Sequence, residues 1–528
     1  AVIPRVAELY GALPDGEIAR VPGDEETAPA GRRYRERDGD IAETQVAIGW
    51  RTLGTRHADT PLLDLAAAVL ASGRSSRLYR AVREQRLASS VSAYNYTPTS
   101  LGVFVLHADG PAERAPEAAR AMWSELQALL DGGVASGDLE RAKRLFESRW
   151  LRRLETMEGQ ANFLAEWEAL GDWRWADEYA ARMLAATPAE VTEAARRYLD
   201  PAQASMMVYR PSSAPVFASG VVEAFAALDN APTSTLEAIA LPTAPSAPAL
   251  VQGTAPERTH GQVSVFRTAR GVPILVRRKA GTPIVHLGLY ALGGALDETA
   301  THAGIATLLA RTTLKGTARR SSDVIALETE LLGGSIAPTV TSDGIGWTLS
   351  VTPRHLAAGI DLLADVVLTP TCPAAAFETE RSVALSQLAQ LRDDMMRYPV
   401  RLATEAAFGA HPYGRGILGN EETLRAVTVD DALGWHRANV RQSPCVLAVV
   451  GDVDPAQIAE VLGSAFASLE YREASPLVYP TWPDGVQQRA DTRDKSQTGL
   501  ALAFPSPSRR DDARIAAHLI AGVASGLG

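Results

Sequence analysis

Side chains that bind metals are present in this sequence, but their spacing does not form a metal site. The nine histidines include no two that lie three or four positions apart, so no helix would present a pair of imidazoles to one ion. Cys372 and Cys445 have no C-x-x-C partner, and we interpret both as buried thiols. A site made of His286 and His302 is an alternative that no spacing supports. The residues alone therefore predict no metal site in this segment.

Length and charge limit the classes to which this chain can belong. Its 528 residues exceed one ordinary domain, and two to four domains are expected. A formal net charge of −10, without a cluster of lysines and arginines, argues against nucleic acid as a partner. No apolar run reaches the roughly 18 residues of a membrane span. The sequence starts without Met and stops inside an apolar, helix-like run, so we expect both ends to be cut and a targeting signal to be missing.

The first part of the chain has the pattern of one α+β domain. Residues 1–30 combine a short helix with a connector rich in Gly, Pro and acidic residues. Strand-like alternation in "ETQVAIGWRT" and in "ASSVSAYNYTPTSLGVFVLHAD" surrounds helical segments, and "ASMMVYRP" closes the unit as a further strand. We therefore expect a domain at 31–211. Residues 212–262, rich in Ala, Pro, Ser and Thr, are expected to form an interdomain linker.

A second unit follows at 263–470, again with strands in one layer and helices in another. "VSVFRTARGVPILVRRKAG" predicts a hairpin, "TPIVHLGLYALGG" an apolar strand, and "HAGIATLLARTTLKGT" a helix. After this unit the first pattern returns, because "KSQTGLALAF" matches "ETQVAIGWRT" and the tripeptide at 71–73 recurs at 524–526. Residues 471–528 are therefore expected to begin a second copy of the first domain.

Long ordered segments resemble the pitrilysin/insulinase family of zinc metallopeptidases, which includes tandem bacterial zinc proteases and mitochondrial processing peptidases. "GGALDETATHAGIATLLARTTLKGT" is similar to the family's zinc-helix region, and "LGGSIAPTVTSDGIGWTLSV" is similar to the strand pair that follows it. "HPYGRGILGNEETLRAVTVDDALGWHRANVRQSPCVLAVVGDVD" resembles the end of the same domain. "VLASGRSSRLYRAVREQRLASSVSAY" resembles the family's non-zinc domain. The similarity covers nearly the whole chain except the linker.

This resemblance implies an α+β fold of repeated two-layer domains, with mainly antiparallel sheets and helices on one face. The domains would form a clamshell whose two halves enclose a chamber where peptides are cut. Residues 1–30 would then hold the last helix of a missing zinc domain, and 31–211 the second, non-zinc domain of the first half. Residues 263–470 would be an inactive homologue of the zinc domain, and 471–528 the start of a truncated fourth domain.

The family's zinc helix carries H-x-x-E-H, in which two histidines bind zinc and the glutamate is the general base for a zinc-bound water. On the resemblance, Thr307 and Arg311 stand at the two histidine positions and Ala310 stands at the base. Gln387 stands at the position of a further, distal glutamate ligand. The guanidinium of Arg311 would also repel a divalent ion, because it is always charged. The segment is predicted to bind no catalytic zinc.

The half without zinc supplies an Arg/Tyr pair in this family, seven positions apart, which holds substrate and stabilises an oxyanion. Arg83 fits the arginine position, but Ser90 stands where the tyrosine would be. The resemblance therefore implies a broken pair in the second domain. Taken alone, Arg83 is interpreted as a helix-surface or ion-paired arginine near Glu84.

Two functions remain open on these grounds. In the first, the segment is the non-zinc portion of a metallopeptidase that cleaves peptides or unfolded proteins, with zinc held by the missing first domain and the halves packed as an intramolecular pseudo-dimer. In the second, it is a non-catalytic scaffold or substrate-binding subunit related to processing-peptidase or respiratory-complex core proteins. Composition suggests a bacterial source, and the resemblance suggests a periplasmic or other extracytoplasmic location. Alone, the 528 residues are expected to be inactive and free of zinc.

Overall fold

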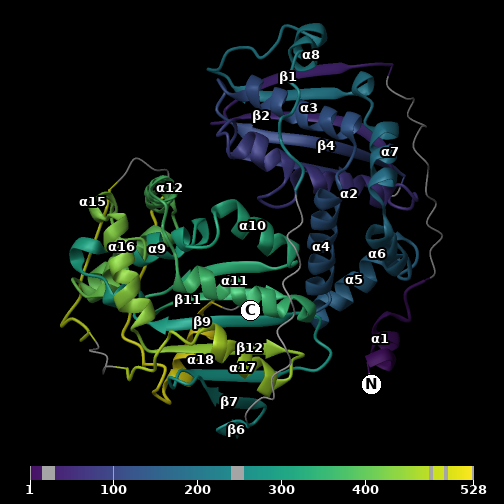
Figure 1. The fold of residues 1–528 in the computed structure, drawn as a ribbon. Coiled ribbons are helices and arrows are strands. Elements are labelled where there is room, and N and C mark those ends of the chain that lie inside the picture. The colour runs from purple at the N-terminus through teal and green to yellow at the C-terminus, as the bar shows by residue number, and fades with distance from the viewer. Residues whose placement is uncertain are drawn as a thin grey trace.

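The computed structural model describes residues 2–14, 30–98, 100–239, 255–474, 480–492 and 497–525. Within these ranges the chain forms two α+β units, each with an open sheet that packs helices against one face (Figure 1). This arrangement confirms the expected fold class of repeated two-layer domains. No helix in the described ranges is long and apolar enough to cross a membrane.

The first unit is built on a five-stranded sheet with the order β1-β5-β2-β4-β3. All neighbouring strands are antiparallel except β1 and β5, which are parallel. Alternate residues of β2 (Val46, Ile48 and Trp50) are buried, because successive side chains of a strand point to opposite faces. Trp50 stacks on Trp123 of α3 with 6.1 Å between ring centroids, which joins the sheet to its helical layer. The strands are β1 (Arg33–Gly39), β2 (Thr44–Leu53), β3 (Ser90–Tyr96), β4 (Leu101–Gly110) and β5 (Ser205–Pro211).

The helices of the first unit lie on the buried face of this sheet or extend from it. A capping box at Thr187 and Glu190 begins α7, as its Thr-Pro-x-Glu sequence favours. The helices are α2 (Thr60–Ala71), α3 (Ala115–Gly132), α4 (Ser136–Arg153), α5 (Met157–Leu170), α6 (Trp175–Ala185), α7 (Pro188–Tyr198) and α8 (Val221–Asp229).

Helix α8 corrects the expectation for the linker. It lies inside the predicted linker at 212–262 and packs on the first unit, where the ring of Phe225 meets Trp123 at 5.9 Å between centroids. Phe225 and Leu228 are buried, and their packing stabilises the helix. The sequence, rich in Ala, Pro and Ser, shows no helical periodicity that would predict it. At the other end of the predicted linker, β6 (Arg258–His260) already pairs with the second sheet. Residues 240–254 lie outside the described residues.

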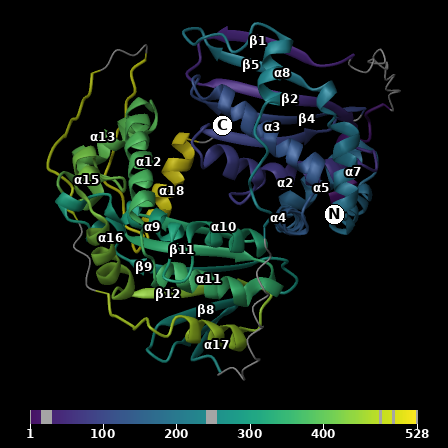
Figure 2. The same cartoon turned by 45° about the horizontal axis from the view of Figure 1, so that its top comes forward.

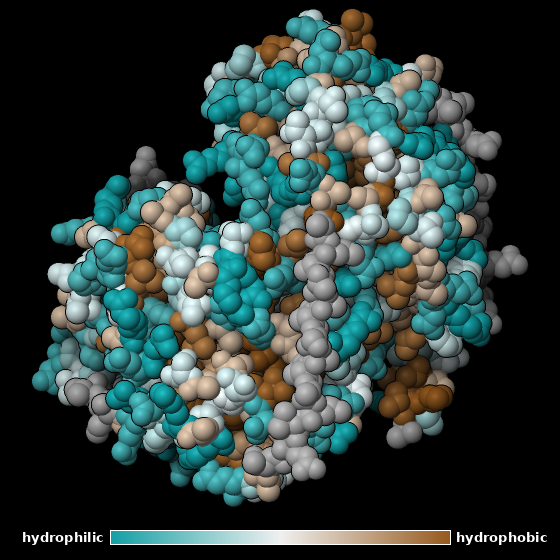
Figure 3. Space-filling model, in the orientation of Figure 1, coloured by the Kyte–Doolittle hydropathy of each residue, from teal (hydrophilic) through white to brown (hydrophobic). Residues whose placement is uncertain are grey.

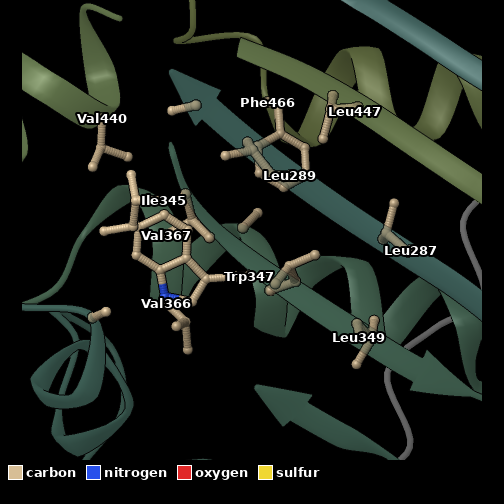
Figure 4. Close-up of a cluster of buried hydrophobic side chains, with 14 of the residues drawn as sticks. Leu287, Leu289, Ile345, Trp347, Leu349, Val366, Val367, Val440, Leu447 and Phe466 are labelled. Atoms are coloured by element: carbon tan, nitrogen blue, oxygen red, sulfur yellow. The ribbon is translucent and has the colours of Figure 1, made fainter. Parts of the chain in front are cut away.

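The second unit holds a seven-stranded sheet with the order β10-β11-β9-β12-β8-β7-β6, in which only β8 and β12 are parallel. Figure 4 shows its core, where Leu289 of β9, Trp347 of β11 and Leu447 of β12 meet Phe466. The indole of Trp347 is fully buried, and its N–H donates to Thr313 Oγ1 at 2.9 Å. The remaining strands are β7 (Val263–Arg267), β8 (Pro273–Arg278), β9 (Val285–Leu292), β10 (Ser335–Val340), β11 (Gly344–Val351) and β12 (Cys445–Gly451).

Helices pack on one face of this second sheet, as they do in the first unit. The predicted helix at 304–315 is present as α9, followed by a 3-10 turn that ends at Lys315. The helices are α9 (Ile305–Thr312), α10 (Ser322–Leu331), α11 (Leu356–Leu368), α12 (Ala374–Asp393), α13 (Arg397–Phe408), α14 (Pro412–Arg415), α15 (Glu421–Ala426), α16 (Val429–His436) and α17 (Pro455–Ala465).

The two units meet along α4, which lies beside α10 in both views (Figures 1 and 2). Glu330 of α10 is 7% exposed and accepts hydrogen bonds from the backbone N–H groups of Arg74 at 2.5 Å and Ser75 at 3.2 Å. Its other oxygen lies 3.2 Å from Nη1 of the fully buried Arg141 in α4. Burial raises the pKa of Glu330, while the charge of Arg141 acts in the opposite sense. Gly73 makes this contact feasible, because a Cβ there would lie 2.5 Å from Glu330 Oε1.

The helices nearest the two ends have apolar faces without a covering layer. In α1 (Val2–Tyr10) no residue is buried, and Ile3 is 83% exposed. At the lower right of the molecule, where Figure 1 places α1, Figure 3 shows a hydrophobic patch. In α18 (Arg514–Ser525) no residue is buried either, and Val523 is 89% exposed. Residues 497–504, which match β2 in sequence, are not a strand here. In the first unit β2 is held between β4 and β5. Within the described residues, no strand pairs with 497–504.

Candidate functional site

Helix α9 begins on a buried carboxylate. Glu298 is 5% exposed and accepts hydrogen bonds from the backbone N–H groups of Gly304 at 2.8 Å and Ala306 at 3.0 Å. These are N–H groups of the first turn, which have no partner within the helix. Burial raises the pKa of Glu298 to about 7, and the two backbone hydrogen bonds oppose that shift. Gly304 has φ +94°, a conformation that glycine adopts at little cost.

The structure brings two of the four predicted site positions into direct contact. Nη2 of Arg311 in α9 donates to Oε1 of Gln387 in α12 at 2.7 Å, across 76 residues of sequence. One helical turn further on, Nζ of Lys315 lies 2.9 Å from Oε1 of Glu380, also in α12. The two pairs fix how α9 and α12 lie against each other.

The other two positions take part in packing. Thr307 is buried, and its hydroxyl donates to the carbonyl oxygen of Ile417 at 2.6 Å. Ala310 is 1% exposed and belongs to the core of the second unit. One position therefore offers a hydroxyl already bonded to the backbone, and the other offers only a methyl group.

This set of donors does not fit a catalytic zinc ion. Zinc in proteins takes imidazole, thiolate and carboxylate ligands, whereas these positions hold a hydroxyl, a methyl, a guanidinium and an amide. The guanidinium of Arg311 carries a fixed positive charge at the place where a divalent ion would sit. Across the described ranges, no group of three or more His, Cys, Asp or Glu residues is arranged to hold a metal.

His286 and His302 are not brought together as a ligand pair. His286 of β9 bonds Ser350 Oγ at 2.9 Å and Glu155 Oε1 of the first unit at 2.8 Å. His302, before α9, bonds Thr299 Oγ1 at 3.0 Å. Each imidazole therefore belongs to a separate network, and the alternative metal site has no support in the geometry.

The two cysteines differ in exposure. Cys372 is fully buried, whereas Cys445 of β12 is half-buried, so full burial was the wrong expectation for Cys445. Burial raises the pKa of each thiol to about 11. Neither thiol is activated as a nucleophile, because the thiolate is the reactive form.

The two positions predicted for an Arg/Tyr pair have different surroundings. Arg83 ends a π-helical turn at Tyr79–Arg83 and is exposed, and within the described residues its side chain forms no hydrogen bond or ion pair. Ser90 begins β3, and its hydroxyl donates to Asp109 Oδ2 at 2.5 Å. Glu84 is not an ion-pair partner of Arg83 here. Its pKa is raised by burial and by the charge of Asp323.

Sequence reasoning did not find the buried glutamates. Glu330 is one of three buried residues of α10, with Ile325 and Leu331, but its position in the sequence carries no signal of burial. Glu298 stands a few residues before the glycine that opens α9, at a spacing no standard capping box uses. Glu298 organises the start of α9 and Glu330 the junction between the units, and neither belongs to a motif.

Comparison with known families places the chain among peptidases. Residues 274–421 match the family described as Insulinase (Peptidase family M16). Residues 2–146 and 426–527 each match the family described as Peptidase M16 inactive domain. The same family model thus matches two separate stretches of the chain.

Two relatives are each similar to this chain over about half of its length. An uncharacterized zinc protease of Mycobacterium leprae is 27% identical over 264 residues, which cover 49% of this chain and 59% of that protein. The mitochondrial-processing peptidase subunit beta of Blastocladiella emersonii is 22% identical over 248 residues, 47% of this chain and 53% of that protein. The chain thus spans little more than half the length of these relatives. The periplasmic protease PqqL from Escherichia coli aligns over 91% of this chain and 55% of its own, with 13% identity and a TM-score of 0.38.

Proposed function

Because the chain belongs to the pitrilysin/insulinase family of zinc peptidases, we propose that it is the non-zinc portion of a metallopeptidase that cleaves peptides or unfolded proteins. The zinc is held by a domain that precedes this sequence. The observation that carries the proposal is the hydrogen bond between Arg311 and Gln387, which fills the place of two metal ligands while α9 and α12 are retained. A domain that keeps these two helices but lacks the metal ligands is suited to support a catalytic domain elsewhere in the longer protein.

The first helix supports a preceding domain of the same kind as the second unit. Val6–Gly11 has the sequence Val-Ala-Glu-Leu-Tyr-Gly, and Ile458–Gly463 of α17 has Ile-Ala-Glu-Val-Leu-Gly. In α17, Ile458 and Leu462 are buried against the second unit's core. The corresponding face of α1 is exposed, so α1 is suited to close a sheet like the one that α17 covers.

In this proposal the halves of the longer protein form an intramolecular pseudo-dimer in a clamshell arrangement, and the substrate is enclosed between them. Arg83 does not act in catalysis, because its partner position is Ser90. The 528 residues alone bind no zinc and hydrolyse no peptide. An extracytoplasmic location belongs to the same proposal.

The test is the metal content and the activity of the longer protein. We expect one zinc per chain, an H-x-x-E-H motif in the preceding domain, and cleavage of an unstructured peptide that a chelator stops. Replacing the glutamate of that motif by glutamine should abolish cleavage, whereas Arg311→Ala should leave the rate within about twofold. An equal loss in both variants, or a second zinc, would contradict the assignment.

The scaffold function is the second candidate, and the same ligand replacements favour it. It predicts a longer protein without zinc and without chelator-sensitive cleavage. One metal measurement therefore separates the two functions.

A further inference from the structure

The edge strand β1 carries a row of arginines on the face of the sheet that helices do not cover. Arg33, Arg35 and Arg37 are all exposed, and they alternate with Tyr34 and Glu36, which are partly buried toward the helical side. Side chains at every second position of a strand share one face, about 6.5 Å apart. β1 is the outermost strand of its sheet, at the top of Figure 1.

These three guanidinium groups are not neutralised within the described residues. Among the ion pairs of the described residues, none involves Arg33, Arg35 or Arg37, although neighbouring residues do form ion pairs. Arg32 pairs with Asp229 at 2.5 Å, and Arg210 of the adjacent strand pairs with Glu36 at 2.5 Å. The formal net charge of the chain is −10, so three arginines without an ion-pair partner form a local patch of the opposite sign.

Exposed apolar side chains lie on the same open face as the three arginines. Arg35 lies opposite Met207 of β5, which is 51% exposed. On the same open face, Tyr94 of β3 is 47% exposed and pairs with Val105 of β4. Across the sheet, the strand pairing that starts at Arg37 of β1 leads to Asp109 of β4. The carboxylate of Asp109 already accepts a hydrogen bond from the Ser90 hydroxyl. The open face thus joins a cationic edge to exposed apolar side chains.

The outer edge of β1 can also accept a strand. The N–H of Arg33 donates to Ala204 O at 3.1 Å, toward β5. Backbone groups of successive residues alternate between the two sides of a strand, so those of Tyr34 and Glu36 point outward. Within the described residues β1 pairs only with β5, and no other backbone hydrogen bond reaches these outward groups.

We propose that β1 binds an extended acidic polypeptide segment, whose carboxylates at alternate positions pair with Arg33, Arg35 and Arg37. A partner strand has the same repeat as β1, so acidic residues at every second position meet successive guanidinium groups. Arginine recognises carboxylates with two parallel hydrogen bonds, which favours this ligand over a diffuse anion.

This proposal concerns binding and does not depend on cleavage, so it can fail without affecting the proposed peptidase function. The probe is a fluorescently labelled peptide with glutamates at alternate positions between valines and threonines, measured by anisotropy with the complete 528-residue chain at low salt. A peptide of equal composition with its glutamates in one block is the sequence control. The alternating peptide should bind more tightly than the block peptide, and binding should weaken as salt rises.

A triple variant tests the residues, and a matched variant controls for charge. Replacing Arg33, Arg35 and Arg37 by serine should weaken binding of the alternating peptide about tenfold. Replacing three exposed arginines of the second unit by serine removes the same charge and should change binding less than twofold; they are Arg258, Arg270 and Arg437. Circular dichroism of both variants would verify folding.

Three results would overturn the proposal. The first is equal affinity for the alternating and block peptides. The second is an equal loss of affinity in the two triple variants. The third is tighter binding of single-stranded RNA or of anionic vesicles than of the alternating peptide, which would assign the row to phosphate groups.

Discussion

Arg311 Nη2 lies 2.7 Å from Gln387 Oε1, and this hydrogen bond joins two helices across 76 residues of sequence. Under the proposed function, this arginine–glutamine hydrogen bond stands where the family resemblance places two zinc ligands. The ion pair between Lys315 and Glu380 also joins the end of α9 to α12.

The first prediction is that restoring the ligand types restores metal binding. The variant carries Thr307→His, Ala310→Glu, Arg311→His and Gln387→Glu, and the parent chain is expected to bind no zinc. At a zinc concentration of 100 times Kd, binding would stabilise the variant by about 2.7 kcal/mol, which calorimetric melting detects. A variant that keeps Arg311 but carries the other three changes is the control. Equal zinc binding by that control would contradict the assigned geometry.

The second prediction concerns the strength of the Arg311–Gln387 bridge. Both residues are half-buried, and the bond has one charged partner. A double-mutant cycle with Arg311→Ala and Gln387→Ala should give a coupling free energy of about 1 kcal/mol in urea unfolding. Arg311→Ala combined with Glu380→Ala should be close to additive, because Arg311 bonds to Gln387 and Glu380 pairs with Lys315. Coupling of equal size in both cycles would mean that the helices shift as a body.

The third prediction is a pH dependence due to Glu298. Its pKa is raised from 4.5 to about 7 in the folded protein, so the folded state binds more protons than the unfolded state between these values. The stabilisation is complete below pH 4.5 and is lost as pH rises through 7. Glu298→Gln should remove this slope, which amounts to at most about 3 kcal/mol. Urea unfolding from pH 4.5 to 8 measures it, with Glu422→Gln in α15 as an exposed control. Parallel profiles for the parent and Glu298→Gln would refute the burial argument.

The fourth prediction tests the junction between the units. Gly73→Ala adds a Cβ that meets the Glu330 carboxylate, and Gly73 also has φ +86°. Gly281→Ala is the matched control, because Gly281 has φ +77° but nothing within 4 Å of its Cβ position. Both should lose about 1–2 kcal/mol of unfolding free energy from backbone strain, and Gly73→Ala should lose more through the displaced carboxylate.

Small-angle scattering would show whether the junction also controls domain spacing. Gly73→Ala is expected to increase the radius of gyration, whereas Gly281→Ala is not. Indistinguishable melting and scattering of the two variants would mean that Glu330 does not hold the units together.

The sequence by itself determined the elements and the class of fold. Alternation in β2 and β4 and the helical period of α9 depend on neighbours a few residues away, so they appear directly in the sequence. The positions that correspond to the family's zinc ligands and general base could also be identified from the resemblance, because the motifs follow one another in the same order along the chain. The helix α8 was not predicted, because its stability comes from Phe225 packing on Trp123 rather than from its own pattern.

Only the tertiary structure decided which distant side chains meet. Glu330 contacts the backbone at Arg74 and the side chain of Arg141, and these partners lie 256 and 189 residues away. Such contacts depend on how two cores pack against each other, which no local period encodes. The row of Arg33, Arg35 and Arg37 is visible as alternation in the sequence. Its place at a free sheet edge beside Met207 follows only from strand order and register.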